Sequence, residues 1–589
     1  MEEFVASIEN FEVQTKDAER VQRETLEKIL EENEETEYLK RFGLNGRRDE
    51  ETFRKCVPLA SHQEFQPYIQ RIADGDSSPI LAAKPFTTLS LSSGTTGGKP
   101  KLLPFNDALC RSYTQQRTTA LAYAVREFSV EEGMFIMFLH VASRHKAKGG
   151  ADVAPITSNL FHQMLSQSSS RQKSTRKIRS CSPMEVATAG DYQQALYCHF
   201  LCGLLYSDQV QYLQAIFCHH MVQAFRTFES IWEELCADLR EGVLSERVSD
   251  PIVRASVSKL IKPSPELADA IYRKCKVLQS KNWSGLIPEL WPQAKYASAN
   301  LTGSMEPYVG KLRHYAGDRL ALVSWIYSAS EGAIGINTRL RTRVESVAYA
   351  VVPGNGYFEF IPLKRRVVEC DALLNSRGEE LMYVESEPVR LTEVIVGELY
   401  EVVISNLAGL YRYRLGDVVK VSGFYNSTPE LQFVRRKGVL LNIINDKTTE
   451  SDLQLAMERA SKLFLEEEKV DIVDFTSYGD LSTEPGYYVI FWELSEVPSR
   501  EILQKCCNCL DQSFVDGAYV NSRKNGSIGA LELRIVGRGT FTKVFEHYQS
   551  LGSTISQFKT PRCITSSNTV VLKILDDNVS ARFFSSAYA

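Results

Sequence analysis

TTLSLSSGTTGGKPK, residues 87–101, begins as an apolar, β-branched strand and continues as a loop of Gly, Ser and Thr. Glycine allows the backbone to turn its N–H groups inward, the hydroxyl groups add hydrogen-bond donors, and Lys99 and Lys101 add positive charge. Together these groups predict a loop that binds a polyphosphate. A simpler alternative, a flexible Gly/Thr hairpin, stays open at this point.

The loop does not have the spacing of a Walker A motif. That motif requires Gly at position 93 and Ser or Thr at position 100. The chain has Ser93 and Pro100 instead, and proline does not allow the same loop-to-helix geometry. We therefore do not expect a P-loop.

Two further motifs carry carboxylates. YSASEG (327–332) ends an apolar strand, and its small residues leave room around Glu331 for a ligand or Mg²⁺. YRYRLGD (411–417) ends in Asp417, which can accept two hydroxyl hydrogen bonds, as a ribose requires. Plainer interpretations stay open: a solvated Glu in a turn, and an edge strand whose arginines face the solvent.

The first 436 residues predict a large α/β domain. An amphipathic helix is expected within 14–40 and packed helices across 185–240, with an exposed hairpin or insertion at 364–392. Strand-like runs occur at 321–327, 357–363, 398–405 and 417–425.

The chain from residue 437 to 589 predicts a smaller α/β domain. Helices are expected at 449–468, 500–515 and 540–551, and strands at 486–494 and 529–536. QFKTPR (557–562) places Lys559 in a proline-ended loop of this domain. A solubilising lysine is the plainer interpretation of that loop.

Composition excludes several classes of protein. The chain has 589 residues, 43% of them apolar and 24% charged, which is typical of a globular protein and not of a disordered or fibrous one. A formal net charge of −5 does not favour a nucleic-acid binder. No run approaches 18 apolar residues, so no membrane span is expected. The acidic N-terminus lacks a secretory signal and the 13 cysteines have no regular spacing, which favours a soluble protein of the cytosol or nucleus.

The cysteines and histidines do not predict a zinc site. Cys198 with Cys202, and Cys506, Cys507 and Cys509, lie on helical patterns without a matching His or Cys pair. We interpret them as core residues.

The four motifs, in this order, resemble the adenylate-forming enzymes. The amino-acid sequences of longer segments resemble the plant Gretchen Hagen 3 acyl acid amido synthetases over essentially the full chain. They resemble the jasmonoyl-amino acid synthetase branch most of all. These segments are TGSMEPYVGKLRHYAGD (302–318), YFEFIP (357–362), AGLYRYRLGDVVKVSGFYN (408–426) and QFKTPRC (557–563).

The resemblance implies a firefly-luciferase-like α/β architecture with a mobile C-terminal domain, a hinge near Arg435–Lys437, and a reaction in two steps. A carboxylic acid attacks the α-phosphate of ATP and expels pyrophosphate, and an amino acid then displaces AMP to leave an amide. ATP and Mg²⁺ are the implied cofactors. The implied substrates are jasmonic acid or a close relative and an apolar amino acid, handled by a cytoplasmic monomer.

The resemblance also assigns residues. Glu331 assists Mg²⁺ or AMP, and Lys559 approaches the phosphate when the small domain closes. The nucleotide phosphates, adenine and ribose are assigned to Ser92, Ser93, Thr95, Thr96, Ser330, Tyr357, Phe358 and Asp417, with Tyr357 and Phe358 beside the adenine. The acid pocket is assigned to Thr119, Phe217, Val222, Trp325 and Ala333. His199, His219 and His220 are expected to be buried core residues, although the helix at 217–225 is also where the family builds its acid pocket.

Departures from the family lie near the acid pocket. Family members commonly read Tyr-Gly-Ser-Ser-Glu where this chain has Tyr327-Ser328-Ala329-Ser330-Glu331, and jasmonate-type enzymes carry a His and a Trp around it where this chain has Trp325 and Ala333. The nucleotide site is thus expected to be intact and the acid site altered. Two alternatives stay open: an acid–coenzyme A ligase of the same superfamily, and a catalytically impaired acid-binding relative.

Overall fold

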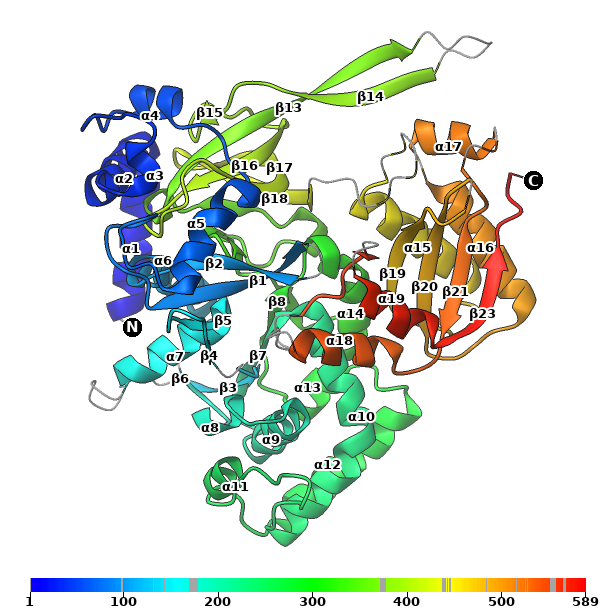
Figure 1. Ribbon diagram of the computed structural model, residues 1–589. Coiled ribbons are helices and arrows are strands. Elements are labelled where there is room, and N and C mark those ends of the chain that lie inside the picture. The colour runs from blue at the N-terminus through cyan, green and yellow to red at the C-terminus, as the bar shows by residue number, and fades with distance from the viewer. Residues whose placement is uncertain are drawn as a thin grey trace.

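A computed structural model describes residues 2–96, 99–130, 132–141, 144–168, 178–370, 378–436, 441, 443, 446, 448–483, 485–514, 516–524, 526, 528–550, 558–564 and 568–588. Within these ranges it does not describe the side chains of residues 93–96, 99, 100, 166–168, 304, 307, 364–370, 378–384, 435, 436, 451, 517, 518 and 521. The described strands form four sheets. Figure 1 shows three of them in the larger part of the molecule and the fourth, built from chain after residue 471, in the smaller part on the right.

A parallel sheet lies in the centre of the larger part. Its strands, in spatial order, are β6 (Ile178–Ser180), β3 (Gly133–Phe138), β7 (Val210–Phe217), β8 (Tyr296–Asn300) and β9 (Ala321–Val323). Parallel strands need crossover connections, and here these are mostly helical. The helices of this region are α8 (Met184–Ala187), α9 (Tyr192–Leu205), α10 (Cys218–Glu241), α11 (Pro251–Val257), α12 (Pro265–Ser280), α13 (Leu286–Leu290), the 3₁₀ turn η1 (Gly303–Tyr308) and α14 (Val309–Ala316).

The prediction of unbroken packed helices across 185–240 is wrong at one place, because β7 lies between α9 and α10. In β7 the glutamines Gln211 and Gln214 stand three residues apart and imitate a helical period. The predicted core cysteines are confirmed for Cys198 and Cys202, which are wholly buried on α9. His199 is a satisfied core residue, since its two ring nitrogens contact the Ser182 hydroxyl at 2.8 Å and the Leu139 carbonyl at 2.9 Å.

The N-terminal segment wraps the larger part. The helix expected within 14–40 is divided at Asp17, whose carboxylate caps α2 by accepting from the Arg20 N–H. The helices are α1 (Glu2–Lys16), α2 (Ala18–Asn33), α3 (Glu37–Lys40), α4 (Glu50–Cys56) and α5 (His62–Asp74). The Gln22 side chain on α2 donates to the carbonyls of Pro353 and Gly356 at 2.6 and 2.7 Å, and the Ala18 N–H donates to the Ser427 hydroxyl. Helix α2 is therefore fixed by chain more than 300 residues away.

The predicted phosphate loop lies in a small N-terminal sheet. Its strands, in spatial order, are β2 (Lys99–Phe105), β1 (Thr88–Thr96), β5 (Asp152–Pro155) and β4 (His145–Lys146). β1 and β2 form an antiparallel hairpin with a register shift between Leu91 and Thr95. The helices α6 (Asp107–Phe128) and α7 (Ile156–Ser168) follow β2 and β5.

A large mixed sheet forms the rest of the larger part. Its path is β10 (Ile326–Ala329), β11 (Gly332–Ile336), β12 (Tyr349–Val351), β18 (Thr428–Arg436), β17 (Tyr413–Tyr425), β16 (Leu399–Ser405), β13 (Tyr357–Cys370) and β14 (Gly378–Glu385), with β15 (Val389–Arg390) beside β13; the turns η2 (Val344–Ser346) and η3 (Pro353–Asn355) connect strands. The strands predicted at 357–363, 398–405 and 417–425 are confirmed. The hairpin expected within 364–392 is β13 with β14, which projects from the top of Figure 1.

The single strand predicted at 321–327 is wrong, because the chain divides between two sheets. β9 belongs to the parallel sheet and β10 to the mixed sheet. Ser324 and Trp325 are the residues at which the chain crosses from one to the other. The sequence motif YSASEG thus begins in β10 and turns into β11.

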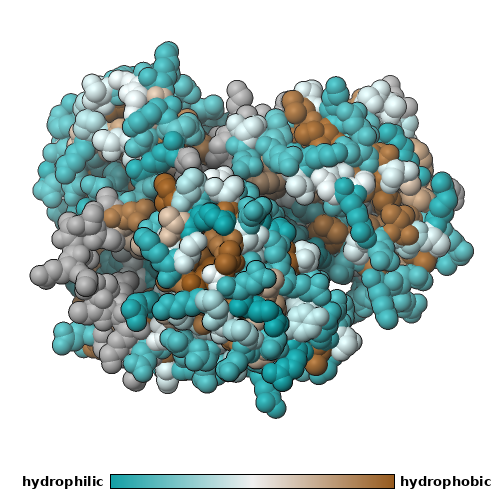
Figure 2. Space-filling model, turned by 90° about the horizontal axis from the view of Figure 1, so that it is seen from below, coloured by the Kyte–Doolittle hydropathy of each residue, from teal (hydrophilic) through white to brown (hydrophobic). Residues whose placement is uncertain are grey.

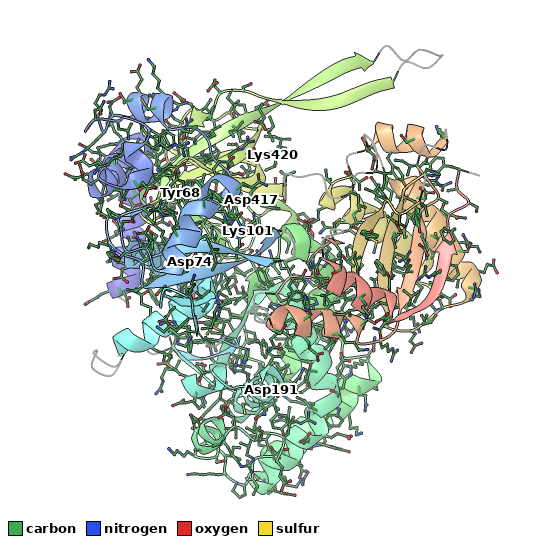
Figure 3. The ribbon with its side chains drawn as sticks, viewed as in Figure 1. Tyr68, Asp74, Lys101, Asp191, Asp417 and Lys420 are labelled. Atoms are coloured by element: carbon green, nitrogen blue, oxygen red, sulfur yellow. The ribbon has the colours of Figure 1, made fainter. Side chains whose placement is uncertain are left out.

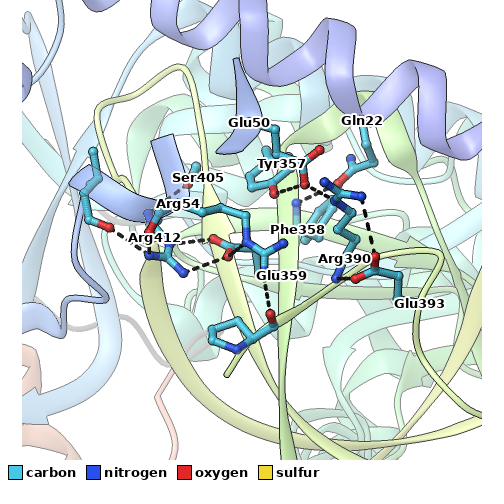
Figure 4. Close-up of polar contacts among 12 residues, drawn as sticks. Gln22, Glu50, Arg54, Tyr357, Phe358, Glu359, Arg390, Glu393, Ser405 and Arg412 are labelled. Atoms are coloured by element: carbon cyan, nitrogen blue, oxygen red, sulfur yellow. Dashed lines mark hydrogen bonds and ion pairs between the residues drawn. The ribbon is translucent and has the colours of Figure 1, made fainter. Parts of the chain in front are cut away.

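The edge-strand interpretation of YRYRLGD is also wrong, because β17 lies between β16 and β18. Arg412 is buried and donates to both carboxylate oxygens of Glu359, each at 2.8 Å (Figure 4). A second guanidinium, from Arg54, lies 3.2 Å from the same carboxylate. Arg412 also donates to the carbonyls of Arg54 and Val57 at the end of α4, so this ion cluster fixes an N-terminal helix to the sheet.

The smaller part has its own sheet and two hydrophobic clusters. Its strands, in spatial order, are β22 (Cys563–Ile564), β19 (Ile472–Asp480), β20 (Tyr487–Leu494), β21 (Glu532–Val536) and β23 (Val579–Phe584). The helices are α15 (Glu450–Phe464), α16 (Arg500–Ser513), α17 (Gly517–Lys524), α18 (Thr540–Ser550) and α19 (Thr569–Asp576). All five elements predicted here are confirmed, and Cys506, Cys507 and Cys509 are buried.

The surface is mainly polar on the face seen from below. Figure 2 shows hydrophobic side chains there in small, separate groups. Across the described residues, no helix combines the length and the hydropathy needed to cross a bilayer.

Candidate active site

A cavity of about 1750 Å³ opens where the sheets of the larger part meet the smaller part. Its walls come from both parts. They include β1, α6, the carboxyl ends of β7 and β8, the turn between β10 and β11, the start of β17, and residues 558–563. Ligands of α/β proteins bind beyond the carboxyl ends of parallel strands, and this cavity has that position.

Two buried carboxylates lie in the cavity wall and are held by two tyrosines. Glu331, in the turn after β10, accepts from the Tyr413 hydroxyl at 3.2 Å. Asp417, on β17, accepts from the Tyr327 hydroxyl at 2.9 Å. β10 with its turn, and β17, therefore each supply one carboxylate and one tyrosine. Each tyrosine donates to the carboxylate of the other segment. The Asn406 side chain further fixes the turn by donating to the Glu331 carbonyl at 2.7 Å.

A third tyrosine braces the same turn from α6. The Tyr113 hydroxyl donates to the Ala329 carbonyl at 2.5 Å. Burial and the nearby Glu331 carboxylate raise the pKa of Tyr113 well above its ordinary value. The phenol is therefore a protonated donor at pH 7.

Positive charge reaches the cavity from both parts of the chain. Lys101 on β2 lines it, as does Lys559 from the smaller part; Figure 3 shows Lys101 below Asp417 in the centre of the molecule. Burial and the Lys101 charge lower the pKa of His62 to about 4, so this histidine is neutral at pH 7. The Lys559 ammonium lies 4.5 Å from the centre of the Phe217 ring.

The phosphate-loop residues are described only in part. Ser92 is buried and lines the cavity. Ser330, which is half-buried, also lines it. The side chains of Ser93, Thr95 and Thr96 lie outside the described residues, as do Gly97 and Gly98 and, at the expected hinge, Lys437.

Aromatic side chains form an apolar end of the cavity. Phe217 and Trp325 both line it, and the Trp325 ring lies 6.0 Å from Tyr212 and 5.9 Å from Tyr296. His219 lines it too, and burial lowers the pKa of His219 to about 4. The imidazole is therefore uncharged at pH 7 and compatible with an apolar ligand.

Three other residues assigned to the acid pocket, all in the described part of the chain, face away from the cavity. Thr119 bonds Ser7 of α1 at 2.7 Å, whereas its neighbour Thr118 lines the cavity. Val222 is buried in the core beneath α10, and Ala333 packs behind the turn among residues of α6. Thr118 and Thr119 differ in this way because adjacent residues of a helix point about 100° apart, and on α10 the residue that lines the cavity is His219.

Tyr357 and Phe358, which were assigned to the adenine, likewise do not line the cavity. The Tyr357 hydroxyl donates to Glu50 of α4 at 2.7 Å, and the Phe358 N–H donates to Gln22 of α2 at 2.8 Å (Figure 4). Both residues lie on a strand that the N-terminal helices cover. The alternating pattern of YFEFIP predicts a strand but not which layer covers it.

Several cavity residues were not predicted. His62, Tyr113 and Thr118 occur in helices whose patterns carry no signal for chemistry. Tyr308 and Arg562 occur in segments that showed the family resemblance, and the Arg562 guanidinium donates to the Tyr308 hydroxyl at 3.0 Å across the two parts. Arg562 also pairs with Asp474 at 2.6 Å.

Three segments of the chain match the domains of one protein family. Residues 7–321, 349–436 and 451–568 match, respectively, the N-terminal, central and C-terminal domains of the GH3 family. The chain belongs to the GH3 family. The architecture of this GH3 protein is that of a solved GH3.15 acyl acid amido synthetase, with a TM-score of 0.85 at 35% identity, covering 98% of this chain and 97% of that one.

Curated relatives cover nearly the whole chain. The jasmonoyl–L-amino acid synthetase JAR4 of Nicotiana attenuata is 53% identical over 581 residues, which are 99% of this chain and 97% of the relative. The jasmonoyl–L-amino acid synthetase GH3.5 of Oryza sativa subsp. japonica is 51% identical over 584 residues, 99% of this chain and 98% of the relative. The resemblance seen in the sequence is thereby confirmed.

Proposed function

We propose that this GH3 protein uses ATP to join a jasmonate-type carboxylic acid to the amino group of an amino acid. The observation that carries the proposal is that the buried carboxylates Glu331 and Asp417 share one cavity with Lys559 from the smaller part. Relatives with 51 and 53% identity, both named as jasmonoyl–L-amino acid synthetases, support the choice of acid.

In the first step the acid's carboxylate attacks the α-phosphate of ATP, and pyrophosphate leaves. Two anions must approach each other, so the site has to offset their repulsion. Lys101 and Lys559 supply the positive charge, and the hydroxyls of Ser92, Ser93, Thr95 and Thr96 are the proposed donors to the phosphates. Asp417, oriented by the Tyr327 hydroxyl, holds the ribose.

Glu331 is suited to assist a magnesium ion. Mg²⁺ in nucleotide sites is bound by one or two carboxylates together with phosphate oxygens and water. Glu331 is a buried carboxylate at the cavity wall, so it can be one of these ligands. When bound, the ion supplies charge stabilisation to the transferring phosphoryl group.

The second step requires an amine to displace AMP and form the amide. The apolar end of the cavity, with Phe217 and Trp325, holds the acyl group during both steps. Lys559 lies against Phe217 and can stabilise the phosphate only while the smaller part stays against the cavity. We therefore assign Lys559 to adenylation.

We also propose a domain boundary between residues 436 and 437, a monomeric state and a cytoplasmic location.

The test is acid-dependent exchange of pyrophosphate into ATP, with and without Mg²⁺. Jasmonic acid, indole-3-acetic acid and a substituted benzoic acid are compared by kcat/KM with isoleucine as the acceptor. We expect jasmonic acid to rank first by at least about tenfold, the scale on which one methylene group in an apolar pocket discriminates between substrates. An auxin or benzoate that ranks first would overturn the choice of acid and leave the ligase activity standing. Product formation with coenzyme A in place of isoleucine would overturn the amide ligase.

A further inference from the structure

The turn that carries Glu331 contains a β-bulge. Tyr327 of β10 pairs with Gly335 of β11, but the next residue, Ser328, pairs with Ala333, so the register between the two strands skips Ile334. A bulge of this kind bends one strand and disrupts the local ladder of hydrogen bonds. The peptide groups beside it need other partners if the bend is to stay in one conformation.

One buried side chain of α6 supplies those partners. The Gln116 amide nitrogen donates to the carbonyls of Tyr327 and Gly335, each at 2.9 Å. Its amide oxygen accepts from the Ser328 hydroxyl at 2.6 Å. Tyr327 and Gly335 are the register pair next to the bulge, so Gln116 bridges both strands at the point where they bend.

Few other side chains could make the three hydrogen bonds that Gln116 makes. A primary amide has two N–H donors and an acceptor oxygen on one rigid group, and all three functions are used here. If the amide were turned by 180°, its oxygen would face two carbonyl oxygens. The contacts therefore decide which atom of the amide is the nitrogen and which is the oxygen. Gln116 is wholly buried and is not part of the cavity wall, whereas Tyr113, one turn earlier on α6, is.

We propose that Gln116 is a positioning residue for adenylation, acting through the bulge on Glu331 and Asp417. The braced segment begins at Tyr327, whose hydroxyl orients Asp417, and runs through Ser328 to Glu331. A satisfied buried polar network fixes one geometry, and catalytic groups lose rate when their geometry relaxes by about 1 Å. The inference rests on the proposed function, because it takes Glu331 and Asp417 to be the Mg²⁺ and ribose contacts.

The test begins with Gln116→Met, which keeps nearly the same length and removes all three hydrogen bonds. In acid-dependent pyrophosphate exchange we expect kcat to fall about 10- to 100-fold. The Mg²⁺ concentration at half-maximal exchange should rise at least about threefold, and the KM for the acid should stay within about twofold, since Phe217 and Trp325 lie outside the brace. The matched control is Gln115→Met on the same helix, which should leave all three quantities unchanged.

A double-mutant cycle with Ser328→Ala separates positioning from general destabilisation. The Ser328 hydroxyl acts on the Gln116 oxygen, so the effects of the two substitutions on kcat should be less than multiplicative. A folded Gln116→Met protein with exchange within about threefold of the natural chain would overturn the proposal. So would independent effects of the two substitutions.

A second variant serves if Gln116→Met does not fold. Gln116→Glu keeps the shape, but an ionised carboxylate faces two carbonyl oxygens and donates nothing, whereas a protonated carboxyl can donate once. Its exchange rate relative to the natural chain should therefore rise as the pH is lowered from 8 to 6, and a flat ratio would refute the brace. If the natural chain shows no acid-dependent exchange, the proposed function fails. The brace is then tested by calorimetry with Mg²⁺ and ATP, in which Gln116→Glu must bind more weakly than the natural chain.

Discussion

Glu331 is the side chain on which the proposed adenylation should depend most. The substitution Glu331→Gln keeps the size and the contact with the Tyr413 hydroxyl but removes the negative charge. We expect acid-dependent pyrophosphate exchange to fall at least about 100-fold, the scale of one preorganised charge-stabilising group. Glu127→Gln, which affects an exposed ion pair with Arg341, is the control. Near-normal exchange in the Glu331 variant would remove this residue from the reaction.

His199 makes stability depend on pH. Burial lowers the pKa of His199 from 6.5 to about 4, so the unfolded chain binds the proton more tightly between these values. Its contribution is complete above pH 6.5 and is lost as the pH falls toward 4, by about 3 kcal/mol in total. The free energy of unfolding in urea, measured from pH 7.5 to 4.5, should fall less steeply for His199→Gln. Parallel curves for the two proteins would contradict the assignment.

The sequence located residues of the cavity wall well where a short motif fixes the backbone and less well where a helix does. Glu331, Asp417 and Lys559 follow short, ordered motifs, and all three line the cavity. Thr119 and Val222 lie on helices, where a change of one residue rotates the side chain by about 100°, and they face the core instead. Which residue of a helix faces the cavity depends on how the helix packs, and the local sequence does not show this.

The ion cluster of Figure 4 attaches α4 to the mixed sheet, and its loss should lower the free energy of unfolding. Glu359 is wholly buried between Arg412 and Arg54. Removing one partner leaves buried charge incompletely compensated, so Arg412→Met should lower the free energy of unfolding by about 3 kcal/mol. Arg390→Met, which breaks a partly exposed pair with Glu50, should cost less than about 1 kcal/mol. Equal effects of the two substitutions in urea unfolding would show that burial does not govern this cluster.

At the scale of elements, alternation and turn signals located most strands of the mixed sheet and of the smaller part. They failed at β7, because its glutamines are spaced as in a helix, and at 321–327, because an apolar run does not reveal that the chain leaves one sheet for another. The contacts of Tyr357 with α4 and of Phe358 with α2 could not be predicted, because contacts across more than 300 residues have no local signature.

Across the whole molecule, one polar cluster joins the two parts. Tyr308 of the larger part accepts from Arg562 of the smaller part, which is held by Asp474, and Lys311 pairs with Asp471 at 3.1 Å. The family resemblance implies different orientations for the two half-reactions. Tyr308→Phe removes a hydrogen bond to a charged group, so we expect the ratio of the single-turnover rates of adenylation and amide formation to change by about tenfold.

A matched control exists within the larger part. The Tyr315 hydroxyl donates to Glu229 at 2.6 Å and does not cross to the smaller part. Tyr315→Phe should therefore leave the ratio of the two rates unchanged. An unchanged ratio in Tyr308→Phe as well would show that this contact does not select between orientations.

The attachment of α1 and α2 to distant chain also bears on the protein's synthesis. Thr15 and Ala18 contact Ser427, and Gln22 contacts residues 353 and 356. At about 5–20 residues per second, a ribosome needs on the order of 20–80 s to produce the roughly 400 residues between these partners. During that interval the apolar stripe of α2, with Leu26, Ile29 and Leu30, lacks η3 and β13, against which α2 packs, although each of these residues is about 1% exposed in the folded protein. Helices α1 and α2 are therefore made long before their partners, and their full set of native contacts can form only after residue 427 has been made.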